Sequence, residues 1–560
     1  PFLPKTTPSA LATNIIVSYF EAGLVGEARN LFDEMSGRDV IAWSAMISGY
    51  SSRNMPEQSW STFLEMMRDG GGGGVRPNEF TFSGVLRACR AMNCYSLSRG
   101  ASVHGMAAKC GVLGNIYIAN CLMDLYGSRR DSVHRAVAVF EEMEFKTRVS
   151  WTTLMASFTH LGDGHGALQF FRKFLLWEAE LNPFIISIAI RASSSTGWRL
   201  YGEQIHGAVC KKGFESDVPV MNSLLDMYSR CSSSMAEAER CFQAMASSRD
   251  IISCNTMIAS YQKSDPYRSL SLFRSLELAP TPFTFTSAVA AAATAAAFGV
   301  GEQVHGSAVR RGMESDVGVA NALIDMYAKC GSIGRSRRVF EETEGKNLVS
   351  YTSMMAGYGS HGRGREAIRL FDRMIGSGME PDRVVFVAAL NACSHAGLVE
   401  EGLQLFDSMI GAHGIQPDRE IYGCVVDLLG RAGRIEEAYE TIERMPMAAD
   451  ESIWGAYLGA CKAHRVVPAE AASRRAKKAA GIWGTYSALS NLYAGDGNWG
   501  EFRRMRRLMR GLRKKKEAGR SCIEVKNRVF SFVAMDRMAA EVDEIEAVYE
   551  VVHSLLLHMR

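Results

Sequence analysis

The sequence predicts an all-α fold, a right-handed superhelical α-solenoid of about 13 helix–turn–helix repeats with a helical C-terminal extension. The string NALIDMY at 321–327 has near-copies at 222–228 and 120–126. A second landmark, the pair His-Gly, recurs at His104, His206 and His305. Both landmarks are spaced by the same 102 and 99 residues, and self-similarity at a fixed period indicates a repeat array.

The long period divides into three kinds of unit. One begins like RDVIAWSAMISGY (from Arg38), one contains FTFSGVLRAC (from Phe80), and the third contains NALIDMY. We expect residues 1–8 to be an N-terminal remnant, 451–520 and 521–560 to form the extension, and the array to occupy 9–450. Its 13 units are 9–39, 40–78, 79–115, 116–147, 148–182, 183–217, 218–250, 251–281, 282–316, 317–347, 348–382, 383–418 and 419–450.

Each unit has the pattern of two helices. In the unit 317–347, Leu323, Ile324 and Tyr327 recur at helical spacing. Gly331 then suits a left-handed helix end, and a second apolar helix leads to Phe340. One such hairpin cannot bury its apolar face alone, so stacked neighbours must share a continuous core.

The composition agrees with a large helical array. Hydrophobic residues make up 47% of the chain, which is enough for a well-buried core, and the net charge of +3 provides no global attraction for nucleic acid. The 13 cysteines are an odd number without pairing spacing, which indicates thiols in a reducing compartment. The longest apolar stretch, 287–301, is shorter than a membrane span and predicts a helix in the unit from Pro282.

The three-unit cycle, the signature strings and the tail resemble the plant pentatricopeptide repeat (PPR) family, in its P-L-S subclass with an E/E+ C-terminal extension and without a DYW deaminase domain. The resemblance covers roughly residues 9–560. The Trp-Leu-Gly-Tyr pattern of tetratricopeptide repeats is absent. The resemblance implies that single-stranded RNA is bound with one base per repeat.

In that family the fifth residue of a unit and its last residue face the concave groove and read the base. Carried over to the P and S units, these pairs are Thr13 and Asp39, Ser44 and Asn78, Asn120 and Thr147, Thr152 and Asn182, Asn222 and Asp250, Asn255 and Thr281, Asn321 and Asn347, and Thr352 and Asp382. Weaker base-reading residues are Ser83, Asn115, Ser187, Asp217, Thr286, Asp316, Asp418 and Asp450. Val387 and Gly423 carry no polar group.

The chemistry of these residue types fits base reading. Asp only accepts hydrogen bonds and favours guanine or uracil, whereas Asn can donate and accept and admits adenine or cytosine. The family's code then implies G for Thr13/Asp39, A for Ser44/Asn78 and Thr152/Asn182, U for Asn222/Asp250, a pyrimidine for Asn321/Asn347 and G for Thr352/Asp382. Asn120/Thr147 and Asn255/Thr281 imply a pyrimidine more weakly. Any one of these residues is as readily a helix cap, so the joint pattern carries the interpretation.

Two further positions follow from the resemblance. At the second position Ile41, Val149, Ile252 and Val349 are stiff apolar spacers beside a base, or ordinary core. At the thirteenth position Arg230, Lys263, Lys329 and Arg431 contact phosphates, or are simply solvated. The three periodic histidines lie three units apart and cannot converge on one metal ion, so we expect them to pack within the second helices of the L units.

The C-terminal region resembles the family's E motifs at 454–464 and 486–509, and its E+ extension at 521–537. Ala518 and Cys522 stand where the family has Pro and Trp, which puts a partner contact of the E+ region in question. No His-x-Glu or Cys-x-x-Cys is present, so we expect no zinc deaminase activity, no catalytic residues, no metal and no cofactor from this chain. Residues 503–520 carry ten Lys or Arg and form either a solvated face or an RNA contact. Residues 541–560 are expected to form an amphipathic helix that binds a partner. The glycine run 70–74 is expected to be a loop.

These features lead to one expected function and two alternatives. The chain is expected to be a site-recognition factor for organellar C-to-U RNA editing that recruits a DYW-type deaminase in trans together with other organellar editing factors. The alternatives are a passive RNA-binding factor for transcript stability, splicing or translation, and a protein-binding solenoid of tetratricopeptide type. The expected state is a monomer without membrane contact in the mitochondrion, with the chloroplast as the alternative.

Overall fold

The computed structural model describes residues 9–35, 37–69, 75–92, 96–177, 180–231, 235–466, 468, 472–473, 476, 483–510, 520–525 and 528–533. These residues form helices joined by short turns, with a single two-stranded sheet near the C-terminal end of the described part. The predicted all-α repeat fold is confirmed. The predictions of a glycine loop at 70–74 and of a helix at 541–560 lie outside the described residues.

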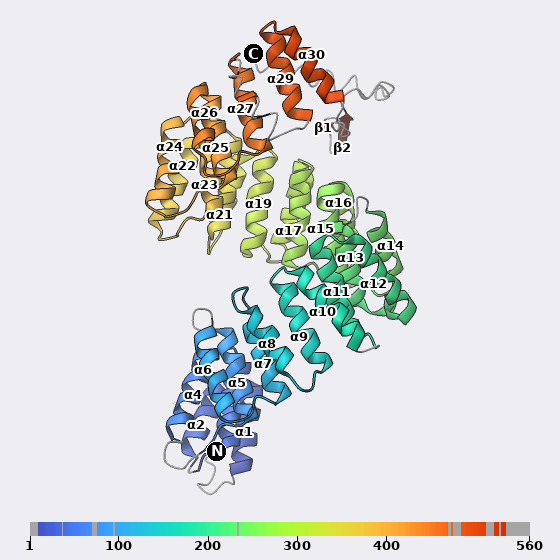
Figure 1. Ribbon diagram of the computed structural model, residues 1–560, viewed down its shortest axis with the longest axis vertical. Coiled ribbons are helices and arrows are strands. Elements are labelled where there is room, and N and C mark those ends of the chain that lie inside the picture. The colour runs from blue at the N-terminus through green and yellow to red at the C-terminus, as the bar shows by residue number, and fades with distance from the viewer. Residues whose placement is uncertain are drawn as a thin grey trace. The chain divides into compact units, whose positions relative to one another are not determined.

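The chain divides into two compact units, Pro1–Met257 and Ile258–Arg560, with helix α15 (Ile251–Ser264) running across the division (Figure 1). The first unit contains α1 (Ser9–Ala22), α2 (Val25–Glu34), α3 (Val40–Ser52), α4 (Pro56–Asp69), α5 (Glu79–Ala91), α6 (Ser96–Lys109), α7 (Ile116–Tyr126), α8 (Val133–Glu142), α9 (Arg148–His160), α10 (Gly164–Trp177), α11 (Pro183–Thr196), α12 (Arg199–Lys212), the short 3-10 helix η2 (Phe214–Ser216), α13 (Val218–Cys231) and α14 (Ala236–Ala244).

The second unit continues the same succession of helices. Its elements are α16 (Pro266–Arg274), α17 (Pro282–Thr294), α18 (Phe298–Val309), α19 (Val317–Lys329), α20 (Ile333–Glu342), α21 (Leu348–Ser360), α22 (Gly364–Gly376), α23 (Arg383–Ala396), α24 (Val399–Gly411), α25 (Arg419–Arg431), α26 (Ile435–Arg444), α27 (Glu451–Ala463), α29 (Trp483–Gly495), α30 (Trp499–Arg510), β1 (Arg520–Val525) and β2 (Arg528–Val533). Helix α17 accounts for the start of the apolar stretch 287–301. None of the described helices is both long and apolar enough to cross a membrane.

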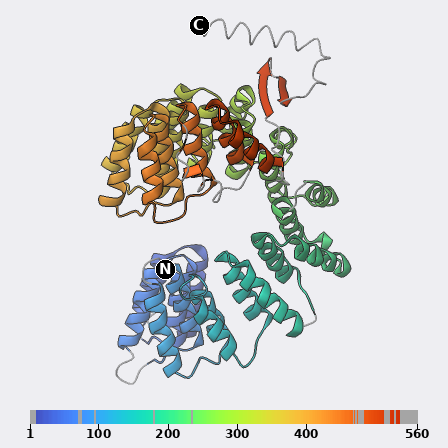
Figure 2. The same cartoon turned by 45° about the horizontal axis from the view of Figure 1, so that its top comes forward.

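The odd-numbered helices stack directly on one another. In the first unit α1, α3, α5, α7, α9 and α11 each contact the next, and in the second unit α17, α19, α21, α23, α25 and α27 do the same. From α1 to α14 and from α17 to α26, each even-numbered helix packs against the odd-numbered helix that precedes it, which Figure 2 shows as a row of antiparallel pairs within each unit. The functional positions of the repeats therefore lie on one layer of helices, and the even-numbered helices support it.

Glycines allow this close stacking at a position that repeats with the array. A Cβ atom built on Gly202 of α12 would lie 2.7 Å from Sδ of Met227 on α13, and one on Gly301 of α18 would lie 2.6 Å from Sδ of Met326 on α19. At such distances a Cβ atom would force the methionine side chain to move. The glycines thus let the first helix of an S unit approach the second helix of the L unit before it.

In the described part of the C-terminal extension, helices α27, α29 and α30 are followed by a hairpin that we did not predict. Strands β1 and β2 pair antiparallel, with Ile523 opposite Phe530 and Val525 opposite Arg528. The signal was present in the sequence, because Ile523 and Val525 alternate with polar residues, as do Phe530 and Phe532 across Ser531. The extension is therefore not helical throughout its described part.

The three periodic histidines bind a tyrosine of the following repeat. Nδ1 of His104, His206 and His305 lies 3.0, 2.8 and 2.8 Å from the hydroxyl of Tyr126, Tyr228 and Tyr327, respectively. Each tyrosine ends the repeated NALIDMY-type string of the S unit. The expectation that these histidines pack within the array is confirmed, and burial lowers the pKa of all three imidazoles.

We expect the protein to lose stability as the pH falls below about 6.5, which is the ordinary pKa of a histidine side chain. In the folded chain burial disfavours the imidazolium, so the unfolded chain binds more protons in this range and acid shifts the equilibrium toward it. The melting temperature at pH 7.5 and at pH 5.5 measures the effect. A variant with all three histidines changed to Asn should lose less on acidification, and an unchanged pH dependence would contradict the prediction.

Candidate nucleic-acid interface

The fifth residues of the units all lie on the stacked odd-numbered helices, one per helix. From α1 to α25 they are Thr13, Ser44, Ser83, Asn120, Thr152, Ser187, Asn222, Asn255, Thr286, Asn321, Thr352, Val387 and Gly423. They are buried or half-buried. Because the odd-numbered helices contact one another in sequence order, these side chains form a ladder within each compact unit.

The last residues of the units all cap a helix. In each case the side chain accepts a hydrogen bond from a backbone N–H in the first turn of the following odd-numbered helix, which is the interaction that makes Asp, Asn and Thr favourable at this position. The caps are Asp39, Asn78, Asn115, Thr147, Asn182, Asp217, Asp250, Thr281, Asp316, Asn347, Asp382, Asp418 and Asp450. A structural role therefore applies to every one of them, and base reading has to be compatible with it.

Direct hydrogen bonds join the fifth and last residues in the units 40–78, 218–250 and 317–347. In the unit 40–78, Oδ1 of Asn78 accepts from Ser44 Oγ at 3.2 Å and from the Thr81 amide at 3.0 Å. In the unit 317–347, Nδ2 of Asn321 donates to Oδ1 of Asn347 at 3.3 Å. These contacts fix the two side chains of one repeat against each other.

The unit 218–250 shows the same arrangement with a carboxylate. Nδ2 of Asn222 donates to both oxygens of Asp250, at 3.2 and 3.3 Å, and the Ser253 amide donates to Oδ1 at 2.7 Å. Burial opposes the charge, yet the bonds from Ser253 and Asn222 hold the pKa of Asp250 below its ordinary value. Asp250 is therefore an anion that can only accept hydrogen bonds.

Helix capping decides which atoms remain for a ligand. A cap must accept, so an Asn whose oxygen also accepts a second hydrogen bond, as at Asn78 and Asn347, retains only its NH2 group. An Asp uses one oxygen and retains acceptor capacity on the other. This sharpens the sequence-based view that Asn both donates and accepts: at Asn78 and Asn347 it presents donors. At Asp418 the second oxygen is also engaged, since its Oδ2 lies 2.6 Å from Nη1 of Arg383.

The fifth side chains present acceptors. The hydroxyls of Thr152 and Thr352 donate to backbone carbonyls of their own helices at 2.9 and 2.7 Å, which uses their proton and leaves their lone pairs. Asn120, Asn222 and Asn321 each have a buried Oδ1 without a hydrogen-bond partner among the described residues. A buried polar atom without a partner is costly, so these three oxygens are the least satisfied polar atoms of the fifth positions.

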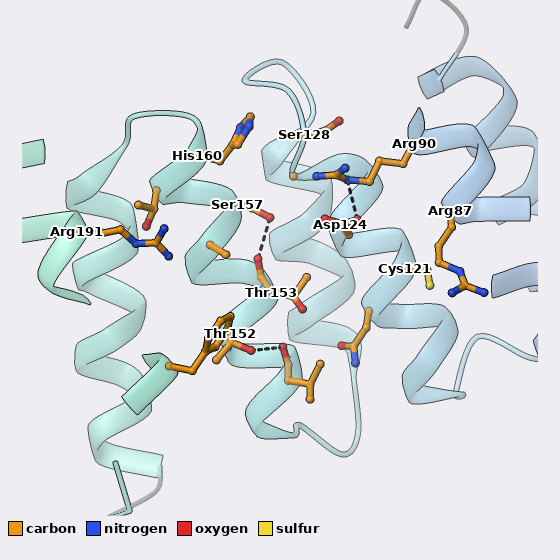
Figure 3. A pocket seen from close by; sticks show the side chains of 16 residues that line it. Arg87, Arg90, Cys121, Asp124, Ser128, Thr152, Thr153, Ser157, His160 and Arg191 are labelled. Atoms are coloured by element: carbon orange, nitrogen blue, oxygen red, sulfur yellow. Dashed lines mark hydrogen bonds and ion pairs between the residues drawn. The ribbon is translucent and has the colours of Figure 1, made fainter. Parts of the chain in front are cut away.

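A groove of about 700 Å³ in the first unit collects several of these positions. Asn120 and Thr152 line it together with the second-position residues Val149 and Phe184. Figure 3 shows the groove running across α5, α7, α9 and α11, with Thr152 below Thr153 in this view. The groove thus combines polar atoms for base edges with apolar side chains at helix starts.

The second-position residues are exposed, which excludes ordinary core. Ile41, Val149, Ile252 and Val349 expose 56 to 61% of their surface. Aromatic residues hold the same position in other units, at Phe80, Tyr117, Phe184 and Phe283, and are equally exposed. An exposed aromatic side chain at a helix start provides a flat surface on which a base can stack, and an exposed aliphatic one can pack against a base.

Three of the four thirteenth-position cations are neutralised within their own helices. Arg230 pairs with Asp226, Lys329 with Asp325 and Arg431 with Asp427, at 2.7 to 2.8 Å. Lys263 is exposed. Contact of these residues with phosphate stays a prediction, and the intrahelical ion pairs weaken its basis.

Sequence reasoning missed the basic residues of the groove. Arg87 and Arg90 on α5 and Arg191 on α11 line it, and they occupy the ninth or twelfth positions of L units. Arg90 binds Asp124 on the neighbouring α7 at 2.7 Å. Their spacing from the unit starts could have identified them, but only the packing of α5 and α11 shows that they face the same groove.

Comparison with protein families supports the repeat assignment. The family model described as PPR repeat family matches residues 38–90 and 346–395, and the model described as PPR repeat matches residues 12–40, 149–176, 319–348, 384–413 and 420–448. The matched segments lie in both compact units.

Three curated relatives from Arabidopsis thaliana extend over nearly the whole chain. A pentatricopeptide repeat-containing protein is 50% identical over 98% of this chain and 89% of its own length. A mitochondrial pentatricopeptide repeat-containing protein is 32% identical over 94% of this chain, and the chloroplastic protein DOT4 is 36% identical over 96% of it. The chain spans only about three fifths of the length of the latter two, 60% and 62% respectively.

Proposed function

Since this chain belongs to the pentatricopeptide repeat family, we propose that it is a sequence-specific single-stranded RNA-binding protein and the site-recognition factor for organellar C-to-U RNA editing. The observation that carries the RNA-binding part is the ladder of paired fifth and last side chains, whose remaining donors and acceptors differ from repeat to repeat. A solenoid that binds proteins has no need for such a restricted set of residues in register. RNA recognition proceeds on single strands, whose base edges are accessible.

Each base would lie between two second-position side chains and meet one pair of polar residues. At Ser44 and Asn78 the pair offers a hydroxyl oxygen and an NH2 group, which matches adenine with its N6 donor and N1 acceptor. At Asn222 and Asp250 it offers the Asp250 carboxylate, an acceptor that suits the N3–H of uracil.

The expected target follows from these pairs. Reading one base per repeat from the 5′ end, the RNA would be 5′-GANYANUYNYGNN-3′, where Y is a pyrimidine and N is unassigned. The L units and the last unit contribute the unassigned positions. The pyrimidines assigned to Asn120/Thr147 and to Asn255/Thr281 are the weaker assignments.

The editing part rests on the resemblance of the chain to P-L-S members with an E/E+ extension. In that subclass the array lies about four nucleotides upstream of the edited cytidine and the tail recruits the deaminase. We assign recruitment in trans of a DYW-type deaminase, with other editing factors, to the region from 451 onward. Helices α27, α29 and α30 form a continuous packed set there. The chain itself would act as a monomer without catalytic residues or cofactor.

An organellar compartment is supported by the relatives, one of which is named mitochondrial and another chloroplastic. We propose the mitochondrion, because E+ members of the subclass favour it.

Plants that lack this protein should lose C-to-U conversion at one or a few cytidines. Sequencing of organellar cDNA from mutant and wild-type plants measures the conversion at every site. The bases upstream of an affected cytidine should match the expected target, and the wild-type gene should restore editing. Unchanged editing with a shifted transcript end or abundance would contradict the editing role and favour the passive RNA-binding function.

A further inference from the structure

We propose that Arg87 and Arg191 form a phosphate-binding path in the first unit, which holds the RNA backbone at two points three nucleotides apart. This inference rests on the proposed function, because it needs single-stranded RNA in the groove. It concerns how the strand is held and adds nothing to the choice of base. Arginine suits this role because its planar guanidinium matches the geometry of a phosphate.

The two arginines occupy equivalent places in the array. Each is the ninth residue of an L unit, Arg87 on α5 and Arg191 on α11. Figure 3 shows them at opposite ends of the groove, with Thr152 and the Arg90–Asp124 pair between them. Asn120 and Thr152, the base-reading residues of the two intervening repeats, line the same groove. A strand that places its bases on these two residues would therefore run from one arginine to the other.

The charges of these two arginines are available to a ligand. Both side chains are exposed, and within the described part of the chain no ion pair is recorded for either. Other basic residues of the same layer are engaged: Arg90 binds Asp124, and Arg53 donates to the backbone carbonyl of Phe20. Unpaired arginines in a hollow lined by base-reading residues favour an anionic ligand.

Arg87 also extends the path toward the N-terminus. It lines a second groove, of about 530 Å³, together with Val17, Ser48 and Ser52 on α1 and α3. The Arg87 side chain therefore lines two successive grooves along the layer of odd-numbered helices. In the second unit the ninth residues of the L units are Ala290 and Asn391, so the path is confined to the first unit.

The first test measures affinity and its salt dependence. Wild-type protein, Arg87→Gln, Arg191→Gln and the double variant are titrated against the fluorescent single-stranded RNA 5′-GACUACUUCUGCC-3′, which satisfies the expected target. Each single variant should bind about three- to tenfold more weakly, and the slope of log K against log salt should become shallower by about 0.7 for each lost phosphate contact. Arg172→Gln, an exposed arginine on the outer helix α10, is the matched control and should bind like wild type.

The second test locates the contacts. Single methylphosphonate linkages, which are uncharged, are placed in turn along the RNA. Wild-type protein should be weakened at two linkages three nucleotides apart. The affinity of Arg87→Gln should not fall further when the 5′ of these two linkages is neutral, but should still fall when the 3′ one is. Arg191→Gln should show the opposite pattern.

The outcomes separate the inference from the proposed function. If wild-type protein prefers the expected RNA over a permuted one, and the two arginine variants bind like Arg172→Gln, the phosphate path is wrong and the proposed function stands. If the variants lose affinity equally at every neutral linkage, the arginines make no local phosphate contact and the inference is again wrong. If wild-type protein binds no single-stranded RNA, the proposed function itself fails.

Discussion

Asn78→Asp is expected to switch the preferred base at the second nucleotide of the target from adenine to guanine. Oδ1 of Asn78 accepts from Ser44 Oγ and from the Thr81 amide, so only its NH2 group is left to donate to N1 of adenine. Asp can keep the same cap through one oxygen and presents the other as an acceptor, which suits N1–H of guanine. A mismatched, unpaired polar group costs about 1–3 kcal/mol. Wild-type protein should therefore prefer the adenine RNA roughly ten- to a hundredfold, and Asn78→Asp should prefer the guanine RNA by a similar factor.

The measurement is a competition between two RNAs that differ only at this nucleotide. The ratio of affinities removes the general effect of the added negative charge. Asp is as good a helix cap as Asn, so the variant should melt like wild type. Asn78→Ala should lose both the discrimination and about 1 kcal/mol of stability. A variant that retains the preference for adenine would show that Asn78 is only a cap.

Phe386→Ala is expected to lower the free energy of unfolding of the second unit by about 3–5 kcal/mol. Phe386 on α23 is fully buried, with its ring 5.4 Å from that of Phe371 and 5.6 Å from that of His413. The cluster around it joins α19, α21, α23 and α25 across successive repeats. Because each repeat of a solenoid contacts only its neighbours, the loss should centre on these helices.

Denaturant unfolding and hydrogen exchange of the amides from α21 to α25 measure this effect. The matched control is Val384→Ala on the same helix, whose side chain is 50% exposed and should change stability by less than about 0.5 kcal/mol. Equal losses for the two variants would contradict the packing described for α23. Unchanged exchange rates in Phe386→Ala would contradict it as well.

The repeats could be predicted from the sequence because the same short sequence signals recur in many units. The string NALIDMY and the period of the His-Gly pair predicted the stacked hairpins, and the Asp and Asn residues at fixed positions predicted the polar ladder. Sequence reasoning failed for the hairpin of β1 and β2, where the alternation of Ile523, Val525, Phe530 and Phe532 covers too few residues to stand out beside strong helical periodicity. Base reading by the ladder stays a proposal.

The amino-acid sequence by itself determined the fold class, the length of the repeat and the places of the fifth and last residues, because helix periodicity and capping are local properties of the chain. Tertiary structure decided what those residues can offer. Capping uses the oxygen of Asn78 and leaves donors, while Asn222 holds Asp250 and keeps an unpaired oxygen. Only the stacking of α5, α7, α9 and α11 brings Arg87 and Arg191 to one groove. Such contacts join residues of different repeats, and their geometry depends on how the helices pack.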